Sequence, residues 1–244
     1  MAVRGVAFAV LACLLEVGPA LADDPPGCPD KEIQYSLEAT QPLNLGQLRQ
    51  QLLSYKCFHY GAEVAGVLKE ARSYIEERAS QVTKPALVLD IDETSLSNWL
   101  EIQHNDYGNI VDGPCDLNSK WACGSRAWDL SQRAEAIEPT LEVFNAAKAK
   151  NVAIFFITGR RDDPEERAAT EATLRAVGYE GWAGLILRPP SSSGPVGGYK
   201  TTAREAIEAT GYKIIANVGD QHSDLDGGYA ERTFKVPNPF YFLP

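Results

Sequence analysis

The sequence predicts an α/β fold in which helices cover a parallel sheet, with a helical region before the first strand and an insertion after it. Four short apolar runs support this prediction, at residues 86–89, 152–157, 185–187 and 214–218. The runs are almost continuous in apolar residues, which is typical of parallel strands buried on both faces. Helical or irregular segments separate them, and this alternation favours right-handed strand–helix–strand crossovers.

Composition limits the function classes. The length of 244 residues fits one domain with elaborations, and 44% hydrophobic with 23% charged residues is ordinary for a globular protein. The formal net charge of -10 argues against non-specific binding of a nucleic acid polymer or an anionic membrane. A locally positive pocket for a small anion remains compatible with that charge.

Residues 1–22 resemble a secretory signal peptide. Arg4 precedes a short apolar core at residues 5–15, and the small-x-small pattern of residues 20–22 predicts cleavage near Ala22. The core is too short for a membrane span. We therefore expect a secreted or periplasmic protein. The alternatives are a buried N-terminal helix and, less favoured, a lipoprotein signal at Cys13.

Cleavage would leave four cysteines: Cys28, Cys57, Cys115 and Cys123. An even number in an exported chain indicates disulfides, with three pairings open. The short spacing of Cys115 and Cys123 favours a local bridge, which would leave Cys28 to pair with Cys57. The alternative is four free, buried thiols.

After residue 22 the chain is predicted to have two parts, the second of which begins with a helical region. Residues 23–43, rich in proline and acids, are expected to form an extended arm, and residues 44–244 a single domain. Between residues 45 and 81, apolar residues recur at three- and four-residue steps, for example Val64, Val67 and Leu68. This spacing predicts a helix with one buried face.

The later helices are predicted from their end signals. The predicted helix starts are at Pro139, at Pro164, and at Thr201 or Thr202. Gly178 and Gly211 lie past the ends of the second and third of these helices.

Residues 95–138 form a long polar and aromatic insertion after the first strand. Its length predicts a cap or lid rather than a plain loop. Trp99 and Tyr107 are weak candidates for contacting a leaving group, although aromatic residues at such irregular spacing more often form a local core.

Polar residues follow the predicted strands at the edge where ligands bind in open parallel sheets. Asp90, Asp92 and Thr94 follow the first, Thr158 and Gly159 end the second, and Asp220 and Asp224 follow the fourth, with Lys200 at a helix start between them. Hard oxygen ligands suit Mg²⁺, and a cluster of carboxylates needs a cation to neutralise it. The combination predicts a site that binds a phosphoryl group and a metal ion.

Four segments carry a family resemblance: "DIDETSLSNW", "FFITGR", "GYKTTAREAI" and "GYKIIANVGDQHSDLDG". In this order they resemble the four motifs of the haloacid dehalogenase (HAD) superfamily, and more closely its subfamily IIIB acid phosphatases, which include plant vegetative storage proteins and bacterial secreted acid phosphatases. The resemblance covers residues 86–228. It implies a Rossmann-like HAD core with a small cap.

The resemblance also implies roles. Asp90 would be the nucleophile that forms an aspartyl-phosphate, and Asp92 the general acid and then the general base. The implied phosphoryl-binding residues are Thr158, Gly159 and Lys200, and the implied Mg²⁺ ligands are Asp90, Asp92 (through its carbonyl), Asp220 and Asp224. Lys213 is the alternative to Lys200, and Thr94 would support the loop.

Three further residues each have two possible roles. His222 replaces a tryptophan that the family often has, and we favour a packing role over substrate contact or pH sensing. Arg160 and Arg161 could bind phosphate or equally lie in a solvated loop.

We therefore expect an exported, Mg²⁺-dependent phosphomonoesterase that acts on a small-molecule phosphate monoester. Nucleoside, aryl and sugar phosphates all fit the pattern. The alternatives are a storage or binding protein with negligible turnover, and a phosphotransferase.

Overall fold

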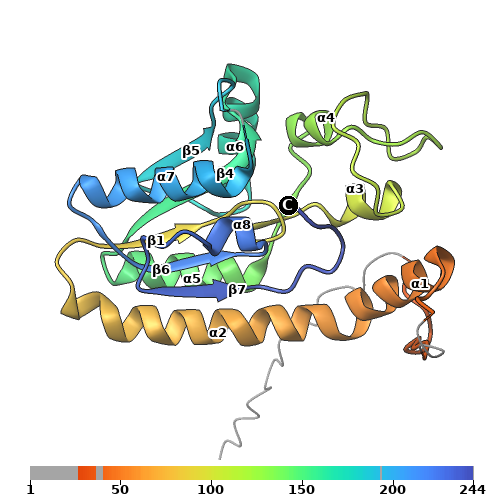
Figure 1. Ribbon diagram of the computed structural model, residues 1–244, viewed down its shortest axis with the longest axis horizontal. Helices are drawn as coiled ribbons and strands as arrows, with labels where there is room; N and C mark the ends of the chain where they lie inside the picture. The colour runs from red at the N-terminus through yellow and green to blue at the C-terminus, as the bar shows by residue number, and fades with distance from the viewer. Residues whose placement is uncertain (1–26, 37–40, 193, 244) are drawn as a thin grey trace, which may run out of the picture.

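The computed structural model describes residues 27–36, 41–192 and 194–243 (Figure 1). The predicted signal peptide lies outside these residues. Of the predicted arm, residues 27–36 contain turns and bends but no helix or strand. No helix among the described residues is both long and apolar enough to cross a membrane.

The main sheet has five parallel strands in the order β5-β4-β1-β6-β7. Its strands are β1 (Pro85–Leu89), β4 (Ala153–Arg161), β5 (Gly184–Arg188), β6 (Lys213–Gly219) and β7 (Arg232–Lys235). The first four match the predicted apolar runs, which confirms the α/β class. Strand β7 was not predicted, because this short edge strand buries only Phe234 and has no apolar run.

Helices cover both faces of the sheet (Figure 1). On one face lie α2 (Gly61–Arg78) and α5 (Glu138–Ala149), and on the other α7 (Val196–Ala209). Alternate residues of β1 divide between these layers. Leu87 and Leu89 join the larger apolar core, whereas Ala86 and Val88 pack with the residues of α7.

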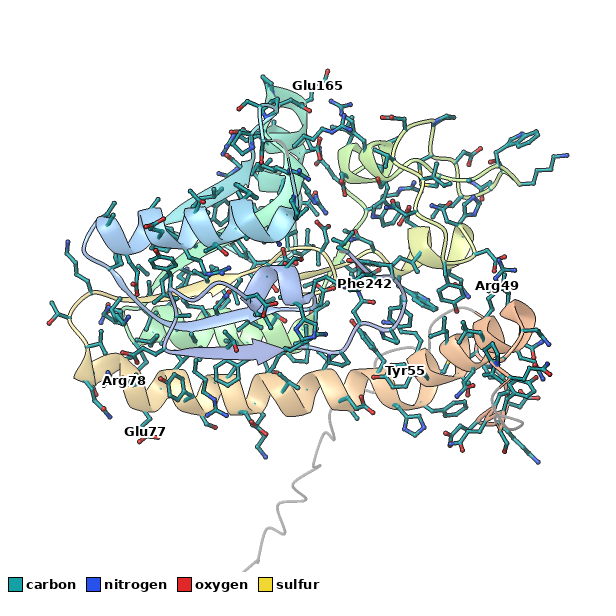
Figure 2. All side chains as sticks on the ribbon, in the orientation of Figure 1. Arg49, Tyr55, Glu77, Arg78, Glu165 and Phe242 are labelled. Carbon is teal, nitrogen blue, oxygen red and sulfur yellow. A yellow bond between two sulfur atoms is a disulfide. The ribbon has the colours of Figure 1, made fainter. Side chains whose placement is uncertain are left out.

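The predicted helical region at 45–81 is continuous but changes type. It comprises α1 (Leu45–Tyr55), a π-helical turn (Lys56–Tyr60), α2, and a final 3₁₀ turn (Ala79–Gln81). The Cys28–Cys57 disulfide fastens the N-terminal segment to the π turn. Arg49 of α1, which is labelled in Figure 2, pairs with Asp106 at 2.8 Å and so joins this region to the insertion.

Two of the three predicted helix starts are confirmed. Pro139 lies in the first turn of α5, and Pro164 begins α6 (Pro164–Ala176). Asp163 caps α6 by accepting hydrogen bonds from the amides of Glu165 and Glu166 at 3.1 and 3.0 Å.

The third predicted start is wrong. Helix α7 begins at Val196 after Pro195, so Thr201 and Thr202 lie inside it. The Thr201 hydroxyl donates to the carbonyl oxygen of Gly197 at 2.9 Å, four residues back, as threonines inside helices often do. Thr201 and Thr202 are residue types that often cap helices, but the helix begins earlier, directly after Pro195.

Residues 95–138 contain two short strands and two short helices. They are β2 (Leu96–Ser97), α3 (Trp99–His104), α4 (Ser125–Leu130) and β3 (Glu135–Ala136). Strands β2 and β3 pair antiparallel at the base of the segment. The Cys115–Cys123 disulfide closes its outer loop, so the structure has both expected bridges. Figure 1 shows α3 and α4 beyond the sheet, on the side where the chain ends.

Candidate active site

Most of the predicted site residues line one cavity of about 700 Å³ at the carboxyl ends of the strands. The cavity is lined by Asp90, Asp92, Gly159, Lys200, Asp220 and Asp224. Thr158 is fully buried behind this surface, and its hydroxyl donates to Asp92 Oδ2 at 3.3 Å. Segments that are far apart in sequence therefore meet at one place, as the sheet topology requires.

Lys200 joins two of the acids. Its Nζ donates to Asp90 Oδ1 and, at 2.6 Å, to Asp224 Oδ1. All three side chains are buried. Burial opposes the charge of Lys200, but the carboxylates of Asp90 and Asp224 outweigh it and raise its pKa. Lys213, the alternative, pairs instead with Glu208 at 2.9 Å.

Three buried carboxylates form a set that fits a metal ion. One oxygen from each of Asp90, Asp220 and Asp224 lies within 4.8 Å of the others. Burial, together with repulsion from Asp224, raises the pKa of Asp90 well above its usual value and that of Asp220 to about 6. Three carboxylates face one ammonium, so a divalent cation would balance the charge, and oxygen donors of this kind are those that Mg²⁺ prefers.

Asp220 is held by four neighbours. Its carboxylate accepts hydrogen bonds from Thr94 Oγ1 (3.2 Å), Gln221 Nε2 (2.6 Å) and Asn238 Nδ2 (2.7 Å). Its backbone carbonyl accepts one from Lys235 Nζ at 2.7 Å. Thr94 thus contacts a predicted metal ligand directly. Asn238 and Lys235 were not predicted, because they lie in a C-terminal segment that has no motif.

Asp92 is fixed by a buried guanidinium. Arg160 donates to Asp92 Oδ1 from Nη2 at 2.6 Å and from Nε at 3.1 Å, and it also contacts Asp129 at 3.0 Å. Asn98 Nδ2 adds a hydrogen bond to Asp92 at 3.0 Å. Burial alone would raise the pKa of Asp92, but the charge and hydrogen bonds of Arg160 bring it below its usual value.

The solvated-loop alternative is wrong for Arg160, whereas phosphate binding by this residue stays a prediction. It is buried inside the site and binds carboxylates of the protein itself. Asp129 belongs to α4 and was not predicted, since a single acid in an irregular insertion carries no signal. The pair joins the insertion to the sheet.

Glu93 explains the third acid of "DIDE". It has a φ of 55° in the tight turn after β1. Its carboxylate accepts hydrogen bonds from the Asn98 amide at 2.6 Å and from the Tyr241 hydroxyl at 2.9 Å. Burial, with repulsion from Asp92, raises the pKa of Glu93 to about 8. Glu93 thus links the loop after β1 to the C-terminal segment through hydrogen bonds.

The weak candidates have separate positions. Trp99 is buried, does not line the cavity, and packs on Phe240 with ring centroids 5.2 Å apart, whereas Tyr107 lines the cavity. His222 opens the short helix α8 (His222–Leu225), is exposed, and is not among the lining residues.

Comparison with known proteins gives consistent matches. Residues 33–244 match the family model described as HAD superfamily, subfamily IIIB (acid phosphatase). The chain is 37% identical over 164 residues to the stem 28 kDa glycoprotein of Glycine max, a match that covers 66% of this chain and 61% of that protein. It is 29% identical to acid phosphatase 1 of Solanum lycopersicum over 75% of this chain and 69% of that one.

The chain spans 52% to 61% of the length of three soybean stem glycoproteins that it matches. Among solved structures, the class C acid phosphatase of Bacillus anthracis has a TM-score of 0.63 at 22% identity, with 80% of this chain and 86% of that chain covered. At this identity the structural match supports the fold.

Proposed function

This chain belongs to subfamily IIIB of the HAD superfamily, the acid phosphatases, and on that premise we propose that it is a magnesium-dependent phosphomonoesterase. The observation that carries the proposal is the buried contact of Lys200 with Asp90 and Asp224, next to Asp220. The Asp90 carboxylate thus has the Lys200 ammonium beside it. The cluster of three acids would need a second cation, a metal ion, to balance its charge. Small phosphate monoesters are the proposed substrates.

In the first proposed step, an oxygen of Asp90 attacks phosphorus and the bond from phosphorus to the ester oxygen breaks. Asp92 must first bind a proton, because Arg160 favours its carboxylate form, and it then gives this proton to the leaving oxygen, which departs as an alcohol. Lys200 offsets the negative charge of Asp90 and of the phosphoryl oxygens. Mg²⁺, when held by Asp90, Asp220, Asp224 and the Asp92 carbonyl, supplies further positive charge.

In the second step, Asp92 removes a proton from water, whose oxygen attacks the phosphorus bound to Asp90. The bond between phosphorus and Asp90 breaks, which releases phosphate and restores the carboxylate. The hydrogen bonds from Arg160 favour the carboxylate form of Asp92 that this step needs. Thr158 and Gly159 would orient the phosphoryl group from the end of β4.

We also propose that residues 95–138 act as a cap within a single domain formed by residues 44–244. Asn98 and Asp129 support this role, because both side chains reach the cavity from the insertion. Trp128 Nε1 donates to Asn98 Oδ1 at 2.8 Å. Trp128 therefore positions Asn98, whose amide nitrogen in turn donates to Asp92.

Export to a secreted or periplasmic location completes the proposal. The signal-like residues 1–22 and the two disulfides support it. N-terminal sequencing of the protein recovered outside the cytoplasm should begin at Asp23. A chain that retains residues 1–22 would contradict this part.

Turnover of 4-nitrophenyl phosphate tests the activity. The wild type should hydrolyse it, a chelator should abolish the reaction, and added Mg²⁺ should restore it. Asp90→Asn should lower kcat on the order of 10³-fold or more, because the nucleophile is lost. Asp226→Asn, at an exposed acid on the loop after α8, is the matched control. Lack of turnover of a broad ester panel would favour the storage alternative, and transfer of phosphate to added alcohol would favour a phosphotransferase.

A further inference from the structure

Two arginines on neighbouring strands line the cavity. Arg161 and Arg188 are register partners on the parallel strands β4 and β5, and both line the cavity. The amide of Asp162 donates to the carbonyl oxygen of Arg188 at 2.8 Å, which holds the two strand ends together. Like charges on neighbouring strands repel each other and destabilise a sheet, unless something compensates them.

Neither guanidinium makes an ion pair among the described residues. An acid in the cavity lining, Glu166, accepts a hydrogen bond from the backbone amide of Arg161 at 3.1 Å and not from its guanidinium. Arg188 donates to the carbonyl oxygen of Gly194 at 2.7 Å, a neutral group. The guanidinium of Arg161 has no hydrogen bond and no ion pair among the described residues, and its side chain is exposed.

The neighbouring arginines, in contrast, do form ion pairs. Arg160 contacts Asp92 and Asp129, and Arg126 contacts Asp163 at 3.2 Å. The chain has 33 acidic against 23 basic residues, so acidic partners are not scarce. The guanidinium groups of Arg161 and Arg188 are thus without ion pairs in a protein that is acidic overall.

The position of the Arg161–Arg188 pair relative to the reacting groups indicates what the pair could bind. Arg161 is the last residue of β4 and follows Thr158 by three residues on that strand. The reacting phosphoryl group belongs at Asp90 and Lys200, deeper in the same cavity. A ligand group at the arginines would therefore belong to the leaving part of the same molecule.

We propose that Arg161 and Arg188 bind a second anionic group, a carboxylate or a phosphate, on the leaving group of the substrate. The inference rests on the proposed function for the position of the reacting phosphate. Two planar guanidinium groups suit these anions, because each can donate two parallel hydrogen bonds.

The test compares phenyl phosphate with 4-carboxyphenyl phosphate and with benzene-1,4-diyl bisphosphate. For each enzyme the measured quantity is the preference, which is kcat/KM for the anionic ester divided by kcat/KM for phenyl phosphate. The double variant Arg161→Gln/Arg188→Gln should lower this preference about tenfold or more for at least one anion, since charge-assisted bonds are lost. Arg72→Gln, an equal charge change on the remote helix α2, should leave it unaltered.

An unchanged preference in the double variant would overturn the inference, as would an equal fall with Arg72→Gln. If the wild type hydrolyses none of the three esters, the proposed function fails. Calorimetric dissociation constants of the same esters then decide the inference separately. A weaker preference for the anionic ligands in the double variant supports it, and identical preferences in the two proteins reject it.

Discussion

Arg160 illustrates how one side chain can set the orientation and charge state of Asp92. Its planar fork binds both oxygens of Asp92 and reaches Asp129 at the same time. A lysine would keep the charge but has one point of contact instead of a fork. The geometry of Asp92 thus depends on the shape of this group as well as on its charge.

We expect Arg160→Lys to lower kcat by about 10- to 100-fold with little change in KM, because Asp92 loses its fixed orientation. Steady-state kinetics with 4-nitrophenyl phosphate measures this. Arg167→Lys, at a half-exposed arginine that pairs with Asp162 at 2.8 Å, is the control and should stay near wild type. A rise in KM alone would show that Arg160 binds substrate instead.

Glu101 is a buried acid whose proton affects stability. Its side chain is only 8% exposed and accepts a hydrogen bond from Asn105 Nδ2 at 2.6 Å. Burial, with repulsion from Asp92, raises the pKa of Glu101 from 4.5 to about 7. The folded state therefore holds this proton more tightly than the unfolded state. Ionisation of Glu101 thus lowers the free energy of unfolding of the protein as pH rises from 4.5 through 7.

Glu101→Gln should remove that loss. Relative to wild type, the free energy of unfolding of the variant should rise by up to about 3 kcal/mol between pH 4.5 and pH 8, at ~1.4 kcal/mol per pKa unit. Urea unfolding at both pH values measures it. Glu77→Gln, at the exposed acid labelled on α2 in Figure 2, should track the wild type. Parallel curves for Glu101→Gln and wild type would contradict the account.

At the scale of elements, the segment after β7 supplies partners to residues of the proposed metal site. Figure 1 shows it leaving β7 and ending between the sheet and the insertion. Asn238 holds Asp220, Tyr241 holds Glu93, and Phe240 packs on Tyr60 and Trp99 with ring centroids 5.2 Å apart in both cases. Partners of a metal ligand fix its orientation and tune its affinity.

Asn238→Ala should therefore weaken Mg²⁺ binding by about 10-fold, within the usual 10- to 100-fold range for outer-shell partners. Isothermal calorimetry on the folded protein measures it without turnover. Phe242→Ala is the control, since Phe242 is 73% exposed although it lies in the same segment (Figure 2). Equal Mg²⁺ affinity for wild type and Asn238→Ala would show that the segment is only packing.

At the scale of the whole molecule, the Cys28–Cys57 disulfide closes a span of 29 residues and joins the N-terminal segment to the helical layer. Loop-closure entropy gives about 3.6 kcal/mol of stabilisation for a span of this length, against about 2.5 kcal/mol for the eight-residue span of Cys115–Cys123. Replacing the first pair with serine should lower the free energy of unfolding more than replacing the second. Denaturant titration of both double variants measures this, and the reverse order would contradict it.

The strands and the acids behind them were predictable because both leave local marks. A buried parallel strand reads as an apolar run, and Asp90 and Asp220 come directly after such runs. Arg160, Asp129 and Asn238 act through contacts between segments 18 to 68 residues apart, which no local pattern records. The start of α7 was missed for the opposite reason, since Thr201 and Thr202 carried a local signal that Pro195 overrode.

The most direct test of the central claim is to trap the phosphorylated protein. A ³²P-labelled phosphate monoester is mixed with Mg²⁺-loaded enzyme, quenched in acid during turnover and mapped by peptide digestion. The account predicts label that hydroxylamine releases, on the peptide containing Asp90. Label on another side chain, or undiminished turnover by Asp90→Asn, would contradict it.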